Sequence, residues 1–214
     1  MQLISVNTGL PREVTWKDQT VTTGIFKEPI AGRIALRRLN LDGDRQADLS
    51  VHGGPDKAVY IYPREHYGFW RSALSGVDWQ WGMFGENFTT EGLLENTVHI
   101  GDQFRIGSAI VTVTQPRMPC YKLGIKFKRH DIIKRFLASG RTGFYVSVLE
   151  EGEVGAGDEI ERIKQDEHQV SVANIVRLYA RDKDDAVMLQ RAIKLPALPE
   201  SWRNYFAERL ENLS

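Results

Sequence analysis

A strand and a stiff loop meet in the segment Ala109-Ile110-Val111-Thr112-Val113-Thr114-Gln115-Pro116-Arg117-Met118-Pro119-Cys120. In its first half Ala109, Val111 and Val113 alternate with Ile110, Thr112 and Thr114. This period of two predicts a strand with both faces at least partly covered. Pro116 and Pro119 disfavour a helical backbone at the residues before them. The sequence therefore places Cys120 on a stiff loop just past a buried strand.

Further strands are expected on both sides of this segment. Residues 58–62 form a β-branched and aromatic run that Pro63 stops, and residues 143–149 form another. Residues 100–104 and 156–160 each place Gly-Asp just before a β-like stretch, as in a turn that leads into a strand. Short strands punctuated by glycine at this density favour a mixed or antiparallel β-barrel. Apolar spacing predicts two short peripheral helices, at 65–74 and 130–137.

The character of the chain changes at about Lys164, where three helical patterns begin. Ser171 is the expected cap of the first, Asp182 or Asp184 of the second, and Pro199-Glu200 leads into the third. We therefore predict a mainly β domain at 1–163 and a three-helix unit at 164–214. About fifty residues are too few for a deep core, so this unit should dock on the barrel or on a second subunit. A homodimer is plausible because one helix face carries Trp202, Tyr205 and Phe206.

The composition limits the class of function. The 214 residues are 42% hydrophobic and 26% charged, as in an ordinary globular protein, and 28 basic residues balance 28 acidic ones. A chain-wide attraction to nucleic acid or to anionic lipid is therefore not expected. No apolar run approaches the roughly 18 residues of a membrane-spanning helix, and the first residues lack the pattern of a signal peptide. We expect a soluble, cytoplasmic protein without stable nucleic-acid or membrane partners.

Cys120 is the only cysteine, so neither an internal disulfide nor a cysteine-rich zinc site is possible. Between Arg117 and Arg135 there are seven basic residues and one acidic residue, Asp131. Nearby cations favour the thiolate, the form that attacks electrophiles or binds a soft metal. A buried, inert cysteine beside a solvated basic helix explains the same residues equally well.

Two other stretches have the composition of a ligand site. In the first, Gly53-Gly54 permits close approach of backbone amides to an anion, with Lys57 as a point charge and His52 as a donor or proton relay. An ordinary tight turn is the alternative there. In the second, Glu86 and Asn87 stand between aromatic residues, as at a pocket rim or in an ordinary loop. Phosphate-loop, dinucleotide-binding, nucleophile-elbow and zinc-protease motifs are absent from the sequence.

Taken together and in this order, the stretches resemble the MOSC domain, named for the C-terminus of molybdenum cofactor sulfurase. The matching elements are the pattern D-x-x-x-H-G-G-x-D-K-A-V-Y at 48–60, Gly85-Glu86-Asn87-Phe88, and Gly101-Asp102 followed by the Cys120 loop. The resemblance covers about residues 1–163. The trailing helices are similar to an extension on stand-alone bacterial members linked to detoxification of N-hydroxylated purine bases.

This resemblance implies a β-barrel-like fold that binds a molybdopterin-type molybdenum cofactor, with Cys120 as the protein ligand of the metal. The pterin dithiolene supplies two sulfurs, so one soft protein ligand suffices. The expected cofactor contacts are His52, Gly53, Gly54, Lys57, Asn87, Arg117 and Lys122.

The function implied is a molybdenum-dependent oxidoreductase that reduces N-hydroxylated compounds, most of all 6-N-hydroxylaminopurine-type bases. A flavoprotein reductase is the expected electron donor, and His52 or Glu86 the group that handles the accompanying proton. A cofactor carrier or sulfur-transfer module without its own turnover is the alternative. A metal-free thiol enzyme, with Cys120 as nucleophile and His52 as base, and an interaction domain with an inert cysteine also remain open.

Overall fold

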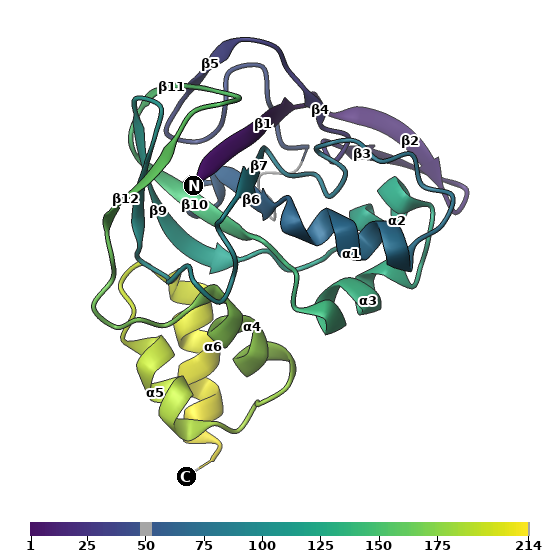
Figure 1. Ribbon diagram of the computed structural model, residues 1–214. Coiled ribbons are helices and arrows are strands. Elements are labelled where there is room, and N and C mark those ends of the chain that lie inside the picture. The colour runs from purple at the N-terminus through teal and green to yellow at the C-terminus, as the bar shows by residue number, and fades with distance from the viewer. Residues whose placement is uncertain (48–52, 214) are drawn as a thin grey trace.

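The computed structural model describes residues 1–47 and 53–213 and is dominated by a mixed sheet (Figure 1). Its strands are β1 (Gln2–Thr8), β2 (Arg12–Trp16), β3 (Gln19–Thr23), β4 (Glu28–Pro29), β5 (Arg33–Leu36), β6 (Val59–Pro63), β7 (Phe88–Glu91), β8 (Gln103–Ile106), β9 (Ala109–Pro116), β10 (Phe144–Glu150), β11 (Gly152–Gly155) and β12 (Ile160–Lys164). Eight of them form one sheet in the order β12-β8-β9-β10-β6-β7-β1-β4, while β2-β3 and β5-β11 form two-stranded sheets. Within the large sheet only the β6–β7 pair is parallel.

The large sheet curls until its two sides approach each other, but it does not form a closed barrel. Gln2 of β1 meets Glu159, just before β12, in an isolated bridge. The Leu3 amide donates to Asp158 O over 2.9 Å, and the Ile160 amide donates to Met1 O over 2.9 Å. Contact between β1 and the start of β12 is thus limited to a few residues and does not form a continuous ladder. The predicted class, mainly β with helices, is confirmed, with this correction to the barrel.

The two predicted Gly-Asp turns are both present and lead into paired strands. Gly101 and Gly157 have φ of 94° and 96°, in the region that favours glycine. Strands β8 and β12 follow them and pair with each other in antiparallel fashion. The two segments are therefore equivalent parts of one sheet.

Three short helices and one 3-10 turn surround the sheet domain: η1 (Pro55–Lys57), α1 (Glu65–Ala73), α2 (Tyr121–Phe127) and α3 (Ile132–Ser139). The predictions of α1 and α3 are confirmed, whereas α2 was not predicted from the sequence. In Figure 1 these three α-helices lie together on one side of the molecule. An aromatic core fills the space beneath them, in which Tyr62 and Phe84 stack at 4.3 Å between ring centroids. No helix in residues 1–47 and 53–213 is long and apolar enough to cross a membrane.

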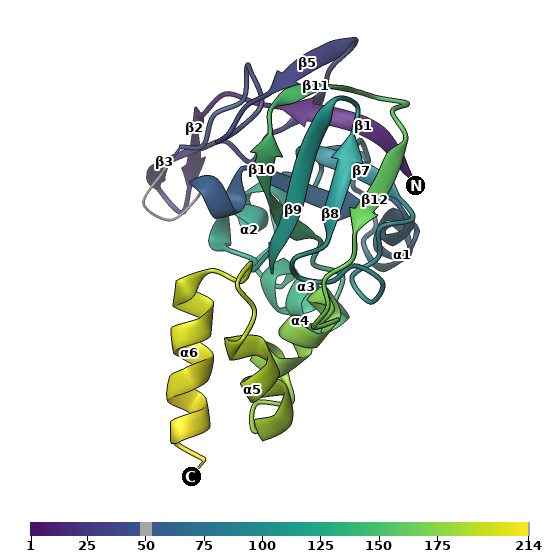
Figure 2. The same cartoon turned by 90° about the vertical axis from the view of Figure 1, so that its left-hand side faces the viewer.

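The C-terminal unit consists of α4 (Val172–Ala180), α5 (Ala186–Ile193) and α6 (Glu200–Glu211). Ser171 caps α4, as predicted, and forms a capping box with Asn174. Helix α5 begins one residue after Asp184 and three after Asp182, the two predicted starts, because the side chain of Asp185 accepts the Met188 amide. Figure 2 shows α6 beside α5, with the C-terminal end extending away from the sheet.

This unit docks on the chain's own sheet domain. Val170, Val172 and Ile175 belong to the same buried cluster as Val111 of β9. The helix face predicted to support a homodimer is largely used internally, since Phe206 is fully buried and Trp202 contacts the sheet domain. Tyr205 is the only one of the three classed as exposed. The face therefore joins the two parts of one chain.

Ser171→Ala should lower the free energy of unfolding by about 1 kcal/mol, because the variant loses the side-chain acceptor of the capping box. Urea denaturation of the variant against wild type measures the difference. Ser201→Ala on the exposed side of α6 is the matched control and should stay within roughly 0.5 kcal/mol of wild type. Equal effects of both substitutions would contradict the capping role.

Candidate functional site

A cavity of about 660 Å³, including its open mouth, lies beside the end of β9. Residues drawn from five stretches, 23–27, 45–47, 53–60, 84–87 and 117–122, line it together with Tyr145. All three stretches singled out in the sequence thus reach the same cavity, although up to about sixty residues separate them.

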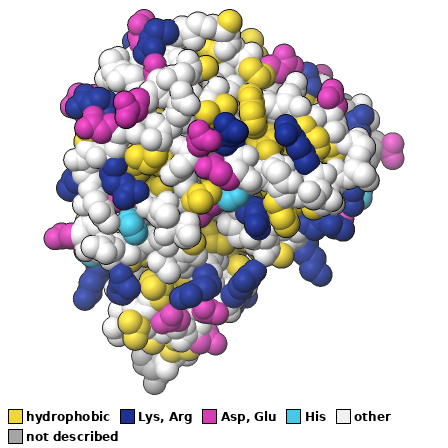
Figure 3. All heavy atoms as spheres, viewed as in Figure 1, with side chains coloured by type: hydrophobic (Ala, Val, Ile, Leu, Met, Phe, Trp, Pro, Cys, Tyr) yellow, Lys and Arg dark blue, Asp and Glu magenta, His cyan; other side chains and the backbone are white. Residues whose placement is uncertain are grey.

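The lining of this cavity carries only positive formal charge. Five cationic side chains contribute to it: Lys27, Arg45, Lys57, Arg117 and Lys122. Among the described lining residues there is no aspartate or glutamate. On the molecular face in Figure 3, by contrast, basic and acidic side chains are interspersed. In a chain of zero net charge, this cavity is a local concentration of positive charge, whose electrostatics suit an anionic ligand.

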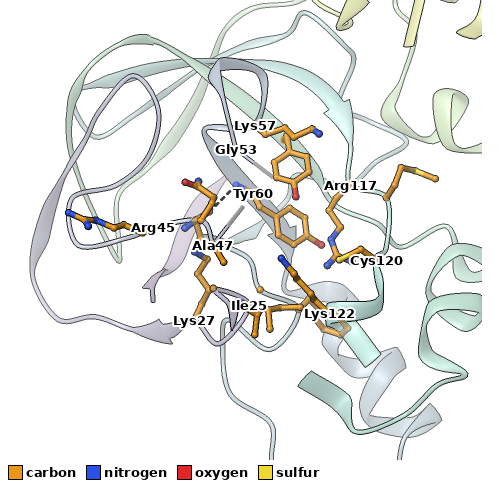
Figure 4. Close-up of a pocket in the computed structure, with 18 residues that line it drawn as sticks. Ile25, Lys27, Arg45, Ala47, Gly53, Lys57, Tyr60, Arg117, Cys120 and Lys122 are labelled. Atoms are coloured by element: carbon orange, nitrogen blue, oxygen red, sulfur yellow. Dashed lines mark hydrogen bonds between the residues drawn. The ribbon is translucent and has the colours of Figure 1, made fainter. Parts of the chain in front are cut away.

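Cys120 lies where the sequence predicted it, on a loop that follows β9. Its backbone is extended, with φ −120° and ψ 170°, and α2 begins at the next residue. The half-buried thiol lines the cavity together with Arg117 and Lys122. In Figure 4 these three side chains lie together on one side of the cavity, while Lys27 comes from the opposite side. The only thiol of the chain is therefore accessible from a positively charged cavity.

Arg117 is the most unusual of the lining residues. Only 5% of the residue is exposed, and its guanidinium carbon lies 5.1 Å from the ring centroid of Phe136 and 5.4 Å from that of Tyr60. Burial by itself lowers the pKa of Arg117, but the interactions with Tyr60, Tyr145 and Cys120 outweigh it and raise the pKa. Its Nη1 atom is buried and has no hydrogen-bond partner among the described residues. A charged donor is thus held at the cavity wall without an acceptor, which costs stability unless a ligand supplies one.

The glycine stretch forms another part of the wall. Gly53 and Gly54 have φ of 96° and 85°, which explains why glycine stands at both positions. Gly53 and Lys57 line the cavity, and η1 between them gives this wall its shape. His52, predicted as a proton relay and cofactor contact, lies outside the described residues.

Asn87 lines the cavity, but its amide group serves mainly to organise the wall. Its Oδ1 accepts the Tyr60 amide over 3.2 Å, and its Nδ2 donates to Asp44 Oδ2 over 2.9 Å. Asp44 is buried and pairs with the ammonium of Lys27, whose pKa is lowered by burial against the opposing effect of Asp44. Asn87 thereby links the central strand β6 to a buried ion pair at the cavity.

Glu86 is fully buried and does not line the cavity. Its carboxylate accepts the amides of Gly82 (2.9 Å) and Phe84 (3.0 Å) and the hydroxyls of Thr89 (3.0 Å) and Tyr67. Burial raises the pKa of Glu86, while these donors act against the shift. The carboxylate holds the loop that carries Gly85 and Asn87, and its predicted proton-handling role finds no support in this geometry.

Among the lining residues that sequence reasoning missed are Lys27, Arg45, Tyr60 and Tyr145. Lys27 and Arg45 lie in stretches without a recognisable motif, and only the tertiary fold brings them to the cavity. Tyr60 and Tyr145 were included in strand predictions. Alternation along β6 and β10 predicts which residues share a face of the sheet, but it does not predict which face lines the cavity.

The comparisons with known proteins agree with this architecture. The MOSC domain family matches residues 48–161, and the YiiM-like 3-alpha helix domain matches residues 170–213. YflK of Bacillus subtilis (strain 168) is 42% identical over 99% of this chain and 95% of its own length. The protein YiiM of Escherichia coli (strain K12) is 36% identical over 87% of this chain and 84% of its own length.

A solved structure and a more distant relative extend the comparison. The crystal structure of YiiM from Geobacillus stearothermophilus superposes with a TM-score of 0.82 at 35% identity, covering 98% of each chain. A protein named reductase from Gibberella moniliformis (strain M3125 / FGSC 7600) is 31% identical over 82% of this chain but only 32% of its own length. The chain belongs to the MOSC domain family, a molybdenum-cofactor-binding type of domain, and carries a YiiM-like three-helix domain at its C-terminal end.

Proposed function

We propose that this protein is a molybdenum-cofactor-dependent reductase of N-hydroxylated compounds, with 6-N-hydroxylaminopurine-type bases as the favoured substrates. The observation that carries the proposal is the cavity itself, in which the only thiol of the chain stands beside a buried arginine whose Nη1 has no hydrogen-bond partner among the described residues, and the charged side chains of the described lining are all cationic. Membership of the MOSC family and similarity to a protein named reductase support it further.

The residues present fit a molybdopterin-type cofactor. The pterin brings its own pair of sulfurs, so Cys120 as a single soft protein ligand completes the donor set. The phosphate of such a cofactor needs positive charge and donors, and Arg117 Nη1 is a buried donor that awaits an acceptor. Lys57, Lys122 and the Gly53 backbone are further contacts at the same wall. Gly54 and Asn87 would contribute through the shape of that wall.

When bound, the cofactor supplies the two-electron chemistry that the amino acids of this chain lack. Reduction of the N-hydroxyl group consumes two electrons and two protons, breaks the N–O bond and yields the amine and water. We propose a separate flavoprotein reductase as the source of the electrons. We also propose a cytoplasmic location.

The chain's own side chains bind and orient the reactants. Arg117 and Lys122 line the cavity together with Cys120 and place positive charge near its thiol. Tyr60 and Tyr145 line the cavity with rings 5.3 Å apart and offer an aromatic surface to a planar base. Within the described lining no carboxylate is available to hold a proton, so His52 remains the predicted proton donor.

The test is elemental analysis for molybdenum, with pterin fluorescence after oxidation, on protein from a cofactor-competent host. Wild type should contain both in near-stoichiometric amounts, and Cys120→Ser should retain roughly tenfold less metal or worse, because it replaces a soft ligand by a hard one. Met118→Leu, at the same cavity, is the matched control and should retain the metal. Wild type should reduce 6-N-hydroxylaminopurine when a flavoprotein reductase is added.

Each other outcome assigns a different function. Bound cofactor without reduction of any N-hydroxylated base would favour the carrier or sulfur-transfer module. An active, metal-free protein blocked by alkylation of Cys120 would favour the thiol enzyme. Absence of molybdenum and pterin from wild type, even after cofactor is added back, would overturn the proposal.

A further inference from the structure

One side chain of the three-helix unit bonds to a strand residue just before the Cys120 loop. The indole Nε1 of Trp202 in α6 donates to the side-chain Oε1 of Gln115 near the end of β9, over 2.8 Å. Tyr179 and Phe206 fix the indole from two sides, each with its ring centroid 5.5 Å away. Gln115 is only 4% exposed, so this bond joins the two parts of the chain in a largely water-free environment.

Gln115 in turn contacts the segment that shapes the cavity. Its Nε2 donates to the backbone oxygen of Asp56 in η1 over 3.3 Å, and the hydroxyl of Thr114 donates to the same oxygen over 2.7 Å. Lys57, the next residue, lines the cavity. A continuous line of hydrogen bonds therefore runs from α6 to the residue before a cavity-lining cation.

A β-bulge makes this arrangement possible. Tyr145 of β10 pairs with Gln115 and Val146 pairs with Val113, so Thr114 is an extra residue in β9. In a regular strand two successive side chains point to opposite faces, whereas a bulge redirects one of them. Here Thr114 and Gln115 both bond the same carbonyl oxygen. Because of the bulge, the end of β9 bonds η1 through two adjacent side chains, just before the Cys120 loop.

We propose that Trp202 is a positioning residue for the cofactor site: through Gln115 it fixes η1, and so holds Lys57 and Gly53 in place at the cavity wall. The three-helix unit is then part of the machinery that retains the cofactor, and not only a packing partner of the sheet. The role in cofactor retention rests on the proposed function, whereas the fixing of η1 does not depend on any ligand.

The first test is hydrogen exchange on the full chain without cofactor. Trp202→Phe keeps an aromatic ring in place and removes the N–H donor, while Gln115→Met removes both hydrogen bonds of the amide at similar volume. Each variant should speed exchange of the Lys57 amide, which bonds Gly54 O within η1, by roughly two- to tenfold, as expected for the loss of one hydrogen bond. The double variant should exchange no faster than Gln115→Met, because the bonds act in series.

Phe206→Leu is the matched control. Phe206 packs on the same indole and is fully buried, so this variant destabilises the helical unit without removing the Trp202 donor. It should lower the melting temperature but leave Lys57 exchange near the wild-type rate. Unchanged Lys57 exchange in Trp202→Phe and Gln115→Met, or equal acceleration in Phe206→Leu, would overturn the proposal.

Cofactor retention provides the second readout. After the same dialysis, Trp202→Phe should keep several-fold less molybdenum and pterin than wild type and Phe206→Leu. If exchange at Lys57 responds as expected but wild type holds no molybdenum, the proposed function fails and the positioning of η1 stands. If wild type holds molybdenum and the variants retain it equally, the proposed function stands and the retention role fails.

Discussion

Arg117→Met is expected to weaken cofactor retention by roughly 10- to 100-fold, the equivalent of losing one charge-assisted hydrogen bond to a buried anion. The guanidinium is almost fully buried, and Nη1 has no acceptor among the described residues. The bonding capacity of Nη1 is therefore available to a ligand. Methionine fills much of the same space between the aromatic rings without the charge.

The same substitution should leave the cofactor-free protein close to wild-type stability. A buried donor without a partner costs about 1–3 kcal/mol, whereas contacts of a guanidinium with aromatic rings contribute about 0.5–2 kcal/mol. These effects nearly cancel, so the free energy of unfolding should change by less than about 1 kcal/mol or should rise. Denaturation of cofactor-free protein and metal analysis of loaded protein measure the two quantities separately.

Arg141→Met is the matched control, because its guanidinium carbon lies 4.0 Å from the ring centroid of Phe69, outside the cavity lining. This variant should lose a similar aromatic contact and retain the cofactor. A strong loss of stability in Arg117→Met, with unchanged cofactor retention, would show that Arg117 serves the fold and not a ligand.

The parts of the site that sequence could predict are those fixed by local chemistry. Pro116 and Pro119 restrict the backbone around Cys120, so the loop and its place after a strand follow from neighbouring residues alone. Gly101 and Gly157 likewise mark turns, because each precedes an aspartate and a β-like run. Ser171 has a partner three residues away, and its capping box is a local motif.

The parts that sequence could not predict depend on contacts between distant residues or on nearly equal local choices. Lys27, Asp44 and Asn87 form one network across sixty residues, and no periodicity relates them. Helix α2 has only seven residues, includes Gly124 and begins without a side-chain cap, so its local signal is weak. The start of α5 falls among three aspartates with the same capping propensity, and only the folded chain selects Asp185.

For Glu86 the sequence predicts a role in proton transfer, whereas the structure shows a buried carboxylate that holds a loop. The variant Glu86→Gln distinguishes these two roles. The substitution should lower the free energy of unfolding by about 3 kcal/mol, because an amide nitrogen would face a buried donor such as the Phe84 amide and leave it unsatisfied. For a chain of this size, that corresponds to a fall in melting temperature of roughly 6–12 °C. Glu208→Gln, on the exposed side of α6, is the control and should melt within roughly 2 °C of wild type.

The free energy of unfolding should depend on pH differently in wild type and in Glu86→Gln. Burial raises the pKa of Glu86 in the folded state, so the folded chain binds this proton more tightly than the unfolded chain does. This contribution to stability is fully present below the unfolded pKa of about 4.3 and is lost as the pH rises through the folded pKa. Glu86→Gln has no such titration, so the difference between wild-type and variant stability should change across this window.

Activity then decides between the two roles. If Glu86 only holds the loop that carries Gly85 and Asn87, the folded fraction of Glu86→Gln should reduce the N-hydroxylated base with wild-type pH dependence. If the carboxyl group instead transfers the proton that accompanies loss of water, the variant should keep its stability and lose activity by about 100-fold or more. The four donors that already occupy the carboxylate, from its own loop, α1 and β7, favour the first result, since each carboxylate oxygen is already bonded within the fold.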